Sequence, residues 1–105
     1  MKIKPGEVWL ADLGMAAKTR PILIVSREDE ETPRALVIQV PLTSQNRGSR
    51  YEVDLGKLRF LSLPSIANVQ GMASIPTVRL ERKLGSISEV QLEQVKTALR
   101  FALDL

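Results

Sequence analysis

The chain has no histidine and no cysteine among its 105 residues. Without an imidazole or a thiolate it cannot build a Ser-His-Asp triad, a Cys-His pair, a two-histidine ribonuclease site or a Cys/His zinc site. A metal site would need oxygen ligands alone, and disulfides are impossible, so nothing requires an oxidising compartment. If the chain is an enzyme, its chemistry depends on Arg, Lys, Asp, Glu, Ser, Thr or Tyr side chains.

Long apolar runs are also absent from the sequence. No stretch approaches the ~20 apolar residues that a membrane-spanning helix needs, and residues 1–6 lack the apolar segment of a signal peptide. The apolar fraction of 44% and the charged fraction of 26% are ordinary for a globular protein. We therefore expect one folded domain over residues 1–105, located in the cytoplasm and not in a membrane.

Charge gives a weak indication of the partner. The 15 Lys and Arg residues exceed the 12 Asp and Glu residues, so the net charge is +3. The excess is local, because residues 47–59 contain four basic residues (Arg47, Arg50, Lys57 and Arg59) and only two acidic ones, Glu52 and Asp54. This distribution is compatible with an ordinary solvated surface or with a polyanionic partner, most commonly nucleic acid.

The apolar pattern predicts short strands followed by one helix. Apolar or alternating segments indicate strands at residues 7–12, 21–26, 35–40, 50–55, 65–70 and 77–80, with 21–26 and 35–40 buried on both faces or nearly so. No helix-length segment separates the strands, which excludes a βαβ arrangement and favours antiparallel pairing. We expect a mainly β fold, a small barrel covered by a C-terminal helix.

The helix is predicted over residues 89–103. Ser88 and Gln91 have the spacing of a capping box, and Ile87 and Leu92 that of a hydrophobic staple. Spacings of three and four residues place the remaining apolar positions on one face. That face consists of Leu92, Val95, Leu99, Ala102 and Leu103.

Two polar segments at strand ends are candidates for chemistry. Residues 18–21 (Lys-Thr-Arg-Pro) precede the second predicted strand, and Pro21 restricts the backbone beside Arg20. Residues 41–45 (Pro-Leu-Thr-Ser-Gln) follow the third, where Thr43 and Ser44 supply two hydroxyls. Each also has a purely structural interpretation: Arg20 as a surface ion-pair residue, and Thr43-Ser44 as a turn-forming pair.

Three motifs in order give the sequence a family resemblance. They are Pro5-Gly6-Glu7-Val8-Trp9-Leu10-Ala11-Asp12-Leu13, Arg20-Pro21-Ile22-Leu23-Ile24-Val25 and Val40-Pro41-Leu42-Thr43-Ser44-Gln45, with weaker matches at 65–70 and in the C-terminal helix. In these motifs the chain resembles the MazF/PemK family of toxin endoribonucleases. It departs from the family at residues 14–19, which are short and lack the usual acidic residue, and at Gln70-Gly71-Met72, where a basic residue is missing.

The resemblance implies an SH3-like β-barrel, usually a homodimer, that cleaves single-stranded RNA without a metal or other cofactor. It also implies a type II toxin whose partner is a small antitoxin with an acidic segment. The family's catalytic pair corresponds here to Arg20 and Thr43. Further RNA-binding candidates are Lys18, Ser44, Gln45, Arg47, Arg50 and Gln70.

Such a reaction needs no histidine, because RNA supplies its own nucleophile. An enzyme that aligns the 2′-hydroxyl with the scissile phosphate gains from orientation. Arg20 can donate two hydrogen bonds to phosphate and Thr43 one more, which stabilises the charge that develops there. The expected products are a 2′,3′-cyclic phosphate and a 5′-hydroxyl. Arginine stays protonated, so the acceptor of the 2′ proton, whether Glu, Asp or water, is left open.

The sequence leaves open two other functions for a protein of the same fold. The chain could be a non-catalytic module that binds RNA or an antitoxin, with activity lost through the short segment 14–19. It could also be a gyrase poison of the CcdB type, which uses aromatic residues at the end of the helix. Residues 100–105 (Arg-Phe-Ala-Leu-Asp-Leu) contain no Trp, which argues against that function.

Overall fold

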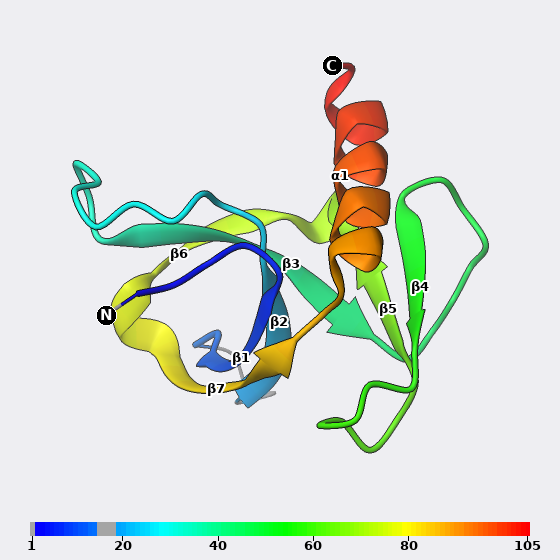
Figure 1. Ribbon diagram of the computed structural model, residues 1–105, viewed down its shortest axis with the longest axis horizontal. Coiled ribbons are helices and arrows are strands. Elements are labelled where there is room, and N and C mark those ends of the chain that lie inside the picture. Colours follow the sequence, from blue (N-terminus) through cyan, green and yellow to red (C-terminus); the bar gives the residue numbers. More distant parts are fainter. Residues whose placement is uncertain (1, 15–18) are drawn as a thin grey trace.

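The structure is a computed structural model that describes residues 2–14 and 19–105. Within these residues the chain forms seven strands, two short 3-10 helices and one α-helix (Figure 1). In chain order they are β1 (Glu7–Asp12), β2 (Thr19–Ile24), β3 (Leu36–Thr43), β4 (Glu52–Gly56), β5 (Ser65–Asn68), η1 (Val69–Gly71), β6 (Ala73–Pro76), η2 (Thr77–Arg79), β7 (Leu80–Ser86) and α1 (Glu89–Leu103).

The strands pair antiparallel in the order β4-β5-β3-β2-β1-β7, and β6 pairs with β3. β3 connects the two parts of the sheet, because its first half pairs with β6 and its last residues, Leu42 and Thr43, pair with β5. The predicted mainly β fold with a C-terminal helix is confirmed. The barrel-like sheet is open in the described part of the chain, where β4 and β7 form the two ends of the strand order.

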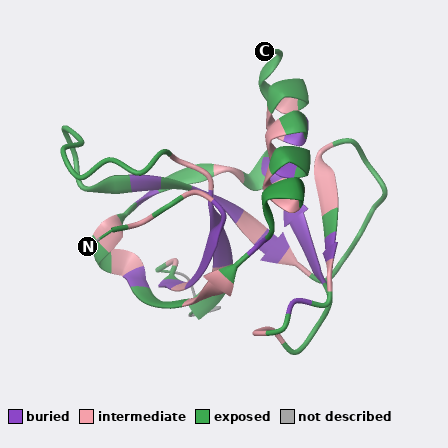
Figure 2. Ribbon diagram, in the orientation of Figure 1, coloured by how far each residue is buried: buried purple, intermediate pink, exposed green. Residues whose placement is uncertain are grey.

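Two hydrophobic clusters lie on opposite faces of the central strands, where buried residues are concentrated (Figure 2). Side chains alternate along β1 and β2, so Val8 and Leu23 join the cluster that includes Val95 of α1. Their neighbours Trp9 and Ile22 join the other cluster. Since both faces of these central strands are covered, burial of the second predicted strand on both faces is confirmed for Ile22–Ile24.

The same expectation is wrong for the first half of β3. Leu36 and Ile38 are each 39% exposed, whereas Val37 and Gln39 between them are buried. This part of β3 pairs with β6 and extends beyond the central strands (Figure 1). Only one of its faces is therefore covered, as in an ordinary half-exposed strand.

The C-terminal third of the sheet differs most from the sequence prediction. The strand expected at 77–80 is instead the 3-10 turn η2 followed by the first residue of β7, and neither β6 nor β7 was predicted. β7 ends the strand order of the described residues, where it pairs with β1, and its charged residues Glu81, Arg82 and Lys83 are exposed. Charged edge strands carry little apolar alternation, so a hydrophobic pattern does not detect them.

The helix follows the prediction closely. α1 runs over Glu89–Leu103, and the Ser88 side chain and the Gln91 side chain form both hydrogen bonds of the capping box. Val95 is fully buried and its apolar neighbours pack against the same cluster. Leu103, however, is 48% exposed and does not extend the buried face. No helix in the described residues is long and apolar enough to cross a membrane.

Candidate functional site

A pocket of about 430 Å³ opens where β3, β4 and β5 meet. Strand pairing creates it, because Thr43 pairs with Ile66 of β5 while Glu52 of β4 pairs with Asn68 at the end of the same strand. Eight residues line the pocket: Thr43, Gln45, Arg47, Ser49, Tyr51, Glu52, Asn68 and Gln70. Four of them, Thr43, Gln45, Arg47 and Gln70, are site residues that the sequence predicted.

The Thr43 hydroxyl is held in place at the end of β3. Its Oγ1 accepts a hydrogen bond from the backbone N–H of Gln45 at 3.2 Å. The turn-forming interpretation of Thr43 is thus confirmed, yet it leaves the catalytic one intact. A hydroxyl that accepts one bond still has its own proton to donate, so Thr43 can present that proton to an anion in the pocket.

Glu52 is a pocket residue that sequence reasoning missed. Its Oε2 accepts from the Arg47 N–H at 2.9 Å, and its Oε1 accepts from the Ser49 N–H at 2.9 Å and the Ser49 hydroxyl at 2.8 Å. These hydrogen bonds, led by that of the Arg47 backbone, lower the pKa of Glu52, so it is ionised at neutral pH. The sequence held one signal, because Ser49-Arg50-Tyr51-Glu52 has the spacing of a capping box although no helix follows.

Arg20 lies on the strand beside Thr43. It is exposed on β2, where it pairs with Ala11 of β1. In the β2–β3 pairing, Ile24 lies opposite Gln39 and Ile22 lies opposite Pro41. If this register continued for two more residues, Arg20 would lie opposite Thr43. Arg20 does not line the pocket itself, and its guanidinium takes part in no ion pair within the described ranges.

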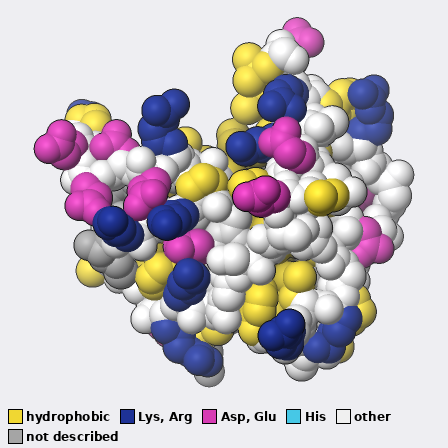
Figure 3. Space-filling model, in the orientation of Figure 1, with side chains coloured by type: hydrophobic (Ala, Val, Ile, Leu, Met, Phe, Trp, Pro, Cys, Tyr) yellow, Lys and Arg dark blue, Asp and Glu magenta, His cyan; other side chains and the backbone are white. Residues whose placement is uncertain are grey.

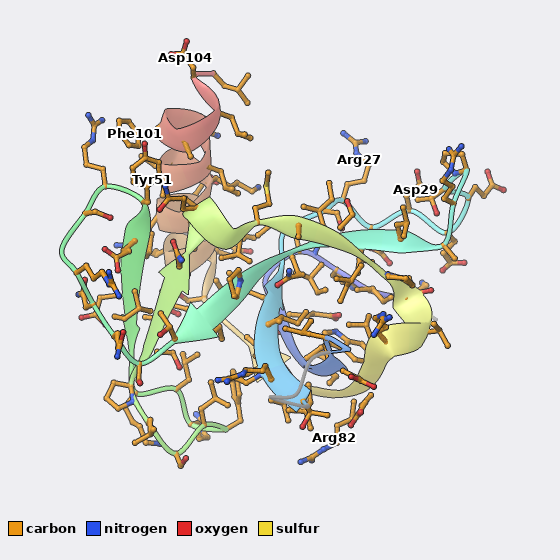
Figure 4. All side chains as sticks on the ribbon, turned by 180° about the vertical axis from the view of Figure 1, so that it is seen from behind. Arg27, Asp29, Tyr51, Arg82, Phe101 and Asp104 are labelled. Atoms are coloured by element: carbon orange, nitrogen blue, oxygen red, sulfur yellow. The ribbon has the colours of Figure 1, made fainter. Side chains whose placement is uncertain are left out.

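The remaining predicted residues are not brought into the pocket. Ser44 is exposed and outside the lining. The Arg50 guanidinium lies 3.9 Å from the centre of the Phe101 ring on α1. Tyr51 contacts the same ring edge-on, with the two ring centres 5.1 Å apart (Figure 4). This stacking gives Arg50 a structural partner on α1, and Arg50 does not line the pocket. Lys18 lies outside the described residues.

Charge is unevenly distributed over the surface. On the face shown in Figure 3, acidic side chains gather over the connection between β2 and β3, which contains residues 28–31. The described residues contain no group of three Asp or Glu side chains placed to hold a metal ion. The pocket itself combines one arginine and one carboxylate with amide and hydroxyl side chains, a composition suited to hydrogen bonding with phosphate or bases.

Known proteins resemble this chain over nearly its whole length. Endoribonuclease MazF3 of Mycobacterium tuberculosis is 31% identical over 84% of this chain and 85% of its own. A solved endoribonuclease from a mycobacterial species, in complex with its cognate antitoxin, superposes with a TM-score of 0.83 at 28% identity, covering 98% of this chain and 96% of that one. The solved structure of the M. tuberculosis toxin MazF-mt6 superposes with a TM-score of 0.82 at 29% identity, covering 97% of this chain and 98% of that one.

The model of one protein family matches residues 4–103. This range includes every helix and strand described above and both segments that carry the candidate residues. The resemblance seen in the three sequence motifs is therefore confirmed. The chain belongs to the PemK-like, MazF-like toxins of type II toxin–antitoxin systems.

Proposed function

We propose that this chain is a toxin that cleaves single-stranded RNA, without a metal, to a 2′,3′-cyclic phosphate and a 5′-hydroxyl. One observation carries the proposal: Arg20 and Thr43 lie at the same end of neighbouring strands, and Thr43 lines a pocket together with Gln45, Arg47 and Gln70. The names of the relatives support it, since those of known activity are endoribonucleases.

In the proposed reaction the protein orients RNA and stabilises charge. The pocket holds the nucleotide beside the scissile bond so that the 2′-oxygen attacks in line with the leaving 5′-oxygen. The planar guanidinium of Arg20 donates two hydrogen bonds to the phosphate, and the Thr43 hydroxyl donates a third. Both groups are aimed at the oxygens on which negative charge grows in the transition state.

Proton transfer follows from the same chemistry. A guanidinium is not a general base in proteins, so Arg20 acts as an electrostatic clamp that also donates a hydrogen bond toward the leaving oxygen. Glu52 is the carboxylate of the pocket, but three donors already occupy its oxygens and its pKa is lowered. Both properties make it a poor base, so in the proposed reaction water takes the proton from the 2′-hydroxyl and water supplies one to the leaving 5′-oxygen.

The partners we propose follow the family. A solved relative is bound to its cognate antitoxin, and we propose that an antitoxin with an acidic segment covers the pocket that holds Arg47. We further propose that this chain acts as a homodimer in the cytoplasm. The gyrase-poison alternative has no support here, because the relatives reported above are named endoribonucleases or toxins of the MazF type.

The first test is cleavage of varied single-stranded RNAs by the purified protein in EDTA, with mass spectrometry of the ends. We expect cyclic phosphate and 5′-hydroxyl ends from wild type. Arg20→Ala and Thr43→Val should each lower the rate by about a hundredfold or more, the usual effect of removing one donor to a developing anion. Thr43→Ser keeps the hydroxyl and should keep most of the activity.

Arg34→Ala is the matched control, because Arg34 is an exposed arginine in the connection beyond the other end of β2. It removes the same charge and should cleave at the wild-type rate. RNA left intact by wild type would refute the proposal. Salt-dependent RNA retention without cyclic-phosphate product would instead identify a binding module.

A further inference from the structure

The loop between β3 and β4, residues 44–51, is held together by side chains rather than by regular backbone pairing. The Asn46 side chain accepts from the Gly48 N–H at 2.8 Å, and Gly48 has a φ of +70°, which a glycine adopts without strain. The Ser49 hydroxyl accepts from the Tyr51 N–H at 3.3 Å. Each of these bonds fixes one turn of the loop locally but does not attach the loop to the sheet.

Glu52 makes that attachment. It belongs to β4 and pairs with Asn68 of β5, so its backbone is fixed in the sheet. Its carboxylate accepts from the N–H groups of Arg47 and Ser49, and its own N–H donates to the Ser49 carbonyl at 3.2 Å. Hydrogen bonds to an ionised acceptor are about twice as strong as neutral ones. One carboxylate therefore ties residues 47–49 to the sheet, while Tyr51 at the end of the loop is held separately by the Val69 N–H, which donates to its carbonyl at 2.9 Å.

The near end of the loop reaches the candidate catalytic hydroxyl. The Gln45 N–H donates to Thr43 Oγ1 at 3.2 Å. Only Asn46 separates Gln45 from Arg47, which Glu52 anchors. A shift of Arg47 would therefore move Gln45 and release the Thr43 hydroxyl to rotate.

We propose that Glu52 is a positioning residue of the RNA-cleaving site: it holds residues 45–49 so that the Thr43 hydroxyl points its proton into the pocket. This inference rests on the proposed function. It gives Glu52 no contact with the reacting atoms, since a carboxylate facing a phosphate would repel it. Its effect reaches substrate through the backbone of the loop.

The test compares Glu52→Gln with Glu93→Gln. Glu93 is an exposed glutamate on α1 whose ion pair is with Lys96 on the same helix, so its variant removes the same charge away from the pocket. In Glu52→Gln the amide oxygen can still accept from Ser49, but the amide nitrogen faces the Arg47 N–H, donor against donor. The loop should loosen while β4 remains paired.

We expect Glu52→Gln to lower kcat by about tenfold to a hundredfold, the scale of a small misplacement of a catalytic group, with little change in KM and in the midpoint of thermal unfolding. Glu93→Gln should match wild type in all three. In a double variant, Glu52→Gln should lower kcat little further than Thr43→Val alone does, because both changes remove the same interaction. Equal activity of the two glutamine variants, or a full further loss in the double variant, would overturn the inference.

A second readout does not depend on cleavage. In amide NMR spectra of Glu52→Gln, the Arg47 signal should shift, and the Gln45 amide and Thr43 methyl signals should shift with it. If only Arg47 and Ser49 respond, Glu52 anchors the loop but does not position Thr43, and the inference is wrong. A wild-type chain that cleaves no RNA would refute the proposed function, whereas these spectra would still decide the role of Glu52.

Discussion

At the scale of single residues, Glu7 shows how a buried carboxylate is stabilised. It is 6% exposed, and its oxygens accept from the Trp9 indole at 3.0 Å and the Lys4 N–H at 3.1 Å and lie 3.1 Å from the Lys83 ammonium. Burial by itself raises the pKa of Glu7, but the hydrogen bonds and the charge of Lys83 outweigh it and leave the pKa lowered. The ionised form therefore stabilises the fold.

The sign of the pH dependence follows. A carboxylate whose folded pKa is below its unfolded value contributes stability above the unfolded value and loses it as pH falls through the folded one. We expect Glu7→Gln to lower the free energy of unfolding at pH 7 by about 1–3 kcal/mol. It should also reduce the loss of stability below pH 4.5, the ordinary value of the group.

Urea unfolding followed by circular dichroism between pH 3 and 7 measures both effects. Glu81→Gln, an exposed position on β7, is the control and should change neither. Parallel pH profiles for wild type and Glu7→Gln would show that Glu7 titrates alike in the folded and unfolded chains.

At the scale of elements, local sequence predicted α1 to the residue and missed β6 and β7. A helix is specified by neighbours three and four residues apart and by its cap, all visible in Ser88–Leu103. Strands β6 and β7 are specified by what they pair with: β6 by the outer half of β3, and β7 by β1. Those partners are distant in the sequence, so pattern alone could not identify either strand.

The C-terminal cap of α1 offers an element-scale prediction. Asp104 has a φ of +58°, a left-handed conformation that glycine usually adopts at this position. Its negative charge also lies at the negative end of the helix dipole. We expect Asp104→Gly to raise the free energy of unfolding by about 1 kcal/mol, seen as a higher midpoint of thermal unfolding. Asp104→Asn, which removes the charge alone, should give a smaller gain. No gain from glycine would mean that the Asp104 conformation carries no strain.

At the scale of the whole molecule, β1, β2 and β3 join two hydrophobic clusters into one body. The single tryptophan, Trp9, lies in the cluster with Ile22 and Val37, whereas α1 packs through Val95 into the cluster on the other face. The central strands contribute side chains to both, so neither cluster can persist when these strands separate. Unfolding should therefore be a single cooperative transition.

Two probes test this cooperativity, one for each cluster. Tryptophan fluorescence follows Trp9, and circular dichroism at helix wavelengths follows α1, the α-helix of the described residues. In urea the two transitions should have the same midpoint and slope. Val95→Ala, which leaves a space on the helix side, should shift both by the same amount, about 1–3 kcal/mol. A helix signal lost before the fluorescence change would show that α1 unfolds independently.

The candidate site, like the fold, could be predicted from local sequence only in part. Sequence motifs pointed to Arg20, Thr43, Gln45, Arg47 and Gln70 because family resemblance and strand-end chemistry are local signals. They did not predict that Glu52 anchors the loop, or that Arg50 stacks on Phe101. Those contacts depend on how the loop folds back toward Glu52 and on the position of Phe101 on α1. The catalytic roles of Arg20 and Thr43 stay predictions until cleavage is measured.

By itself, the sequence determined the permitted chemistry, the helix with its caps, the central strands and the family motifs. Each depends on composition or on residues within a few positions of one another. Only the tertiary structure decided that Thr43 and Gln70 share a pocket, that one face of outer β3 is exposed, and that Glu52 ties the loop to the sheet. The physical reason is that pairing of β3 with β5 and β6 joins segments far apart in the chain, and side-chain surroundings follow from that pairing.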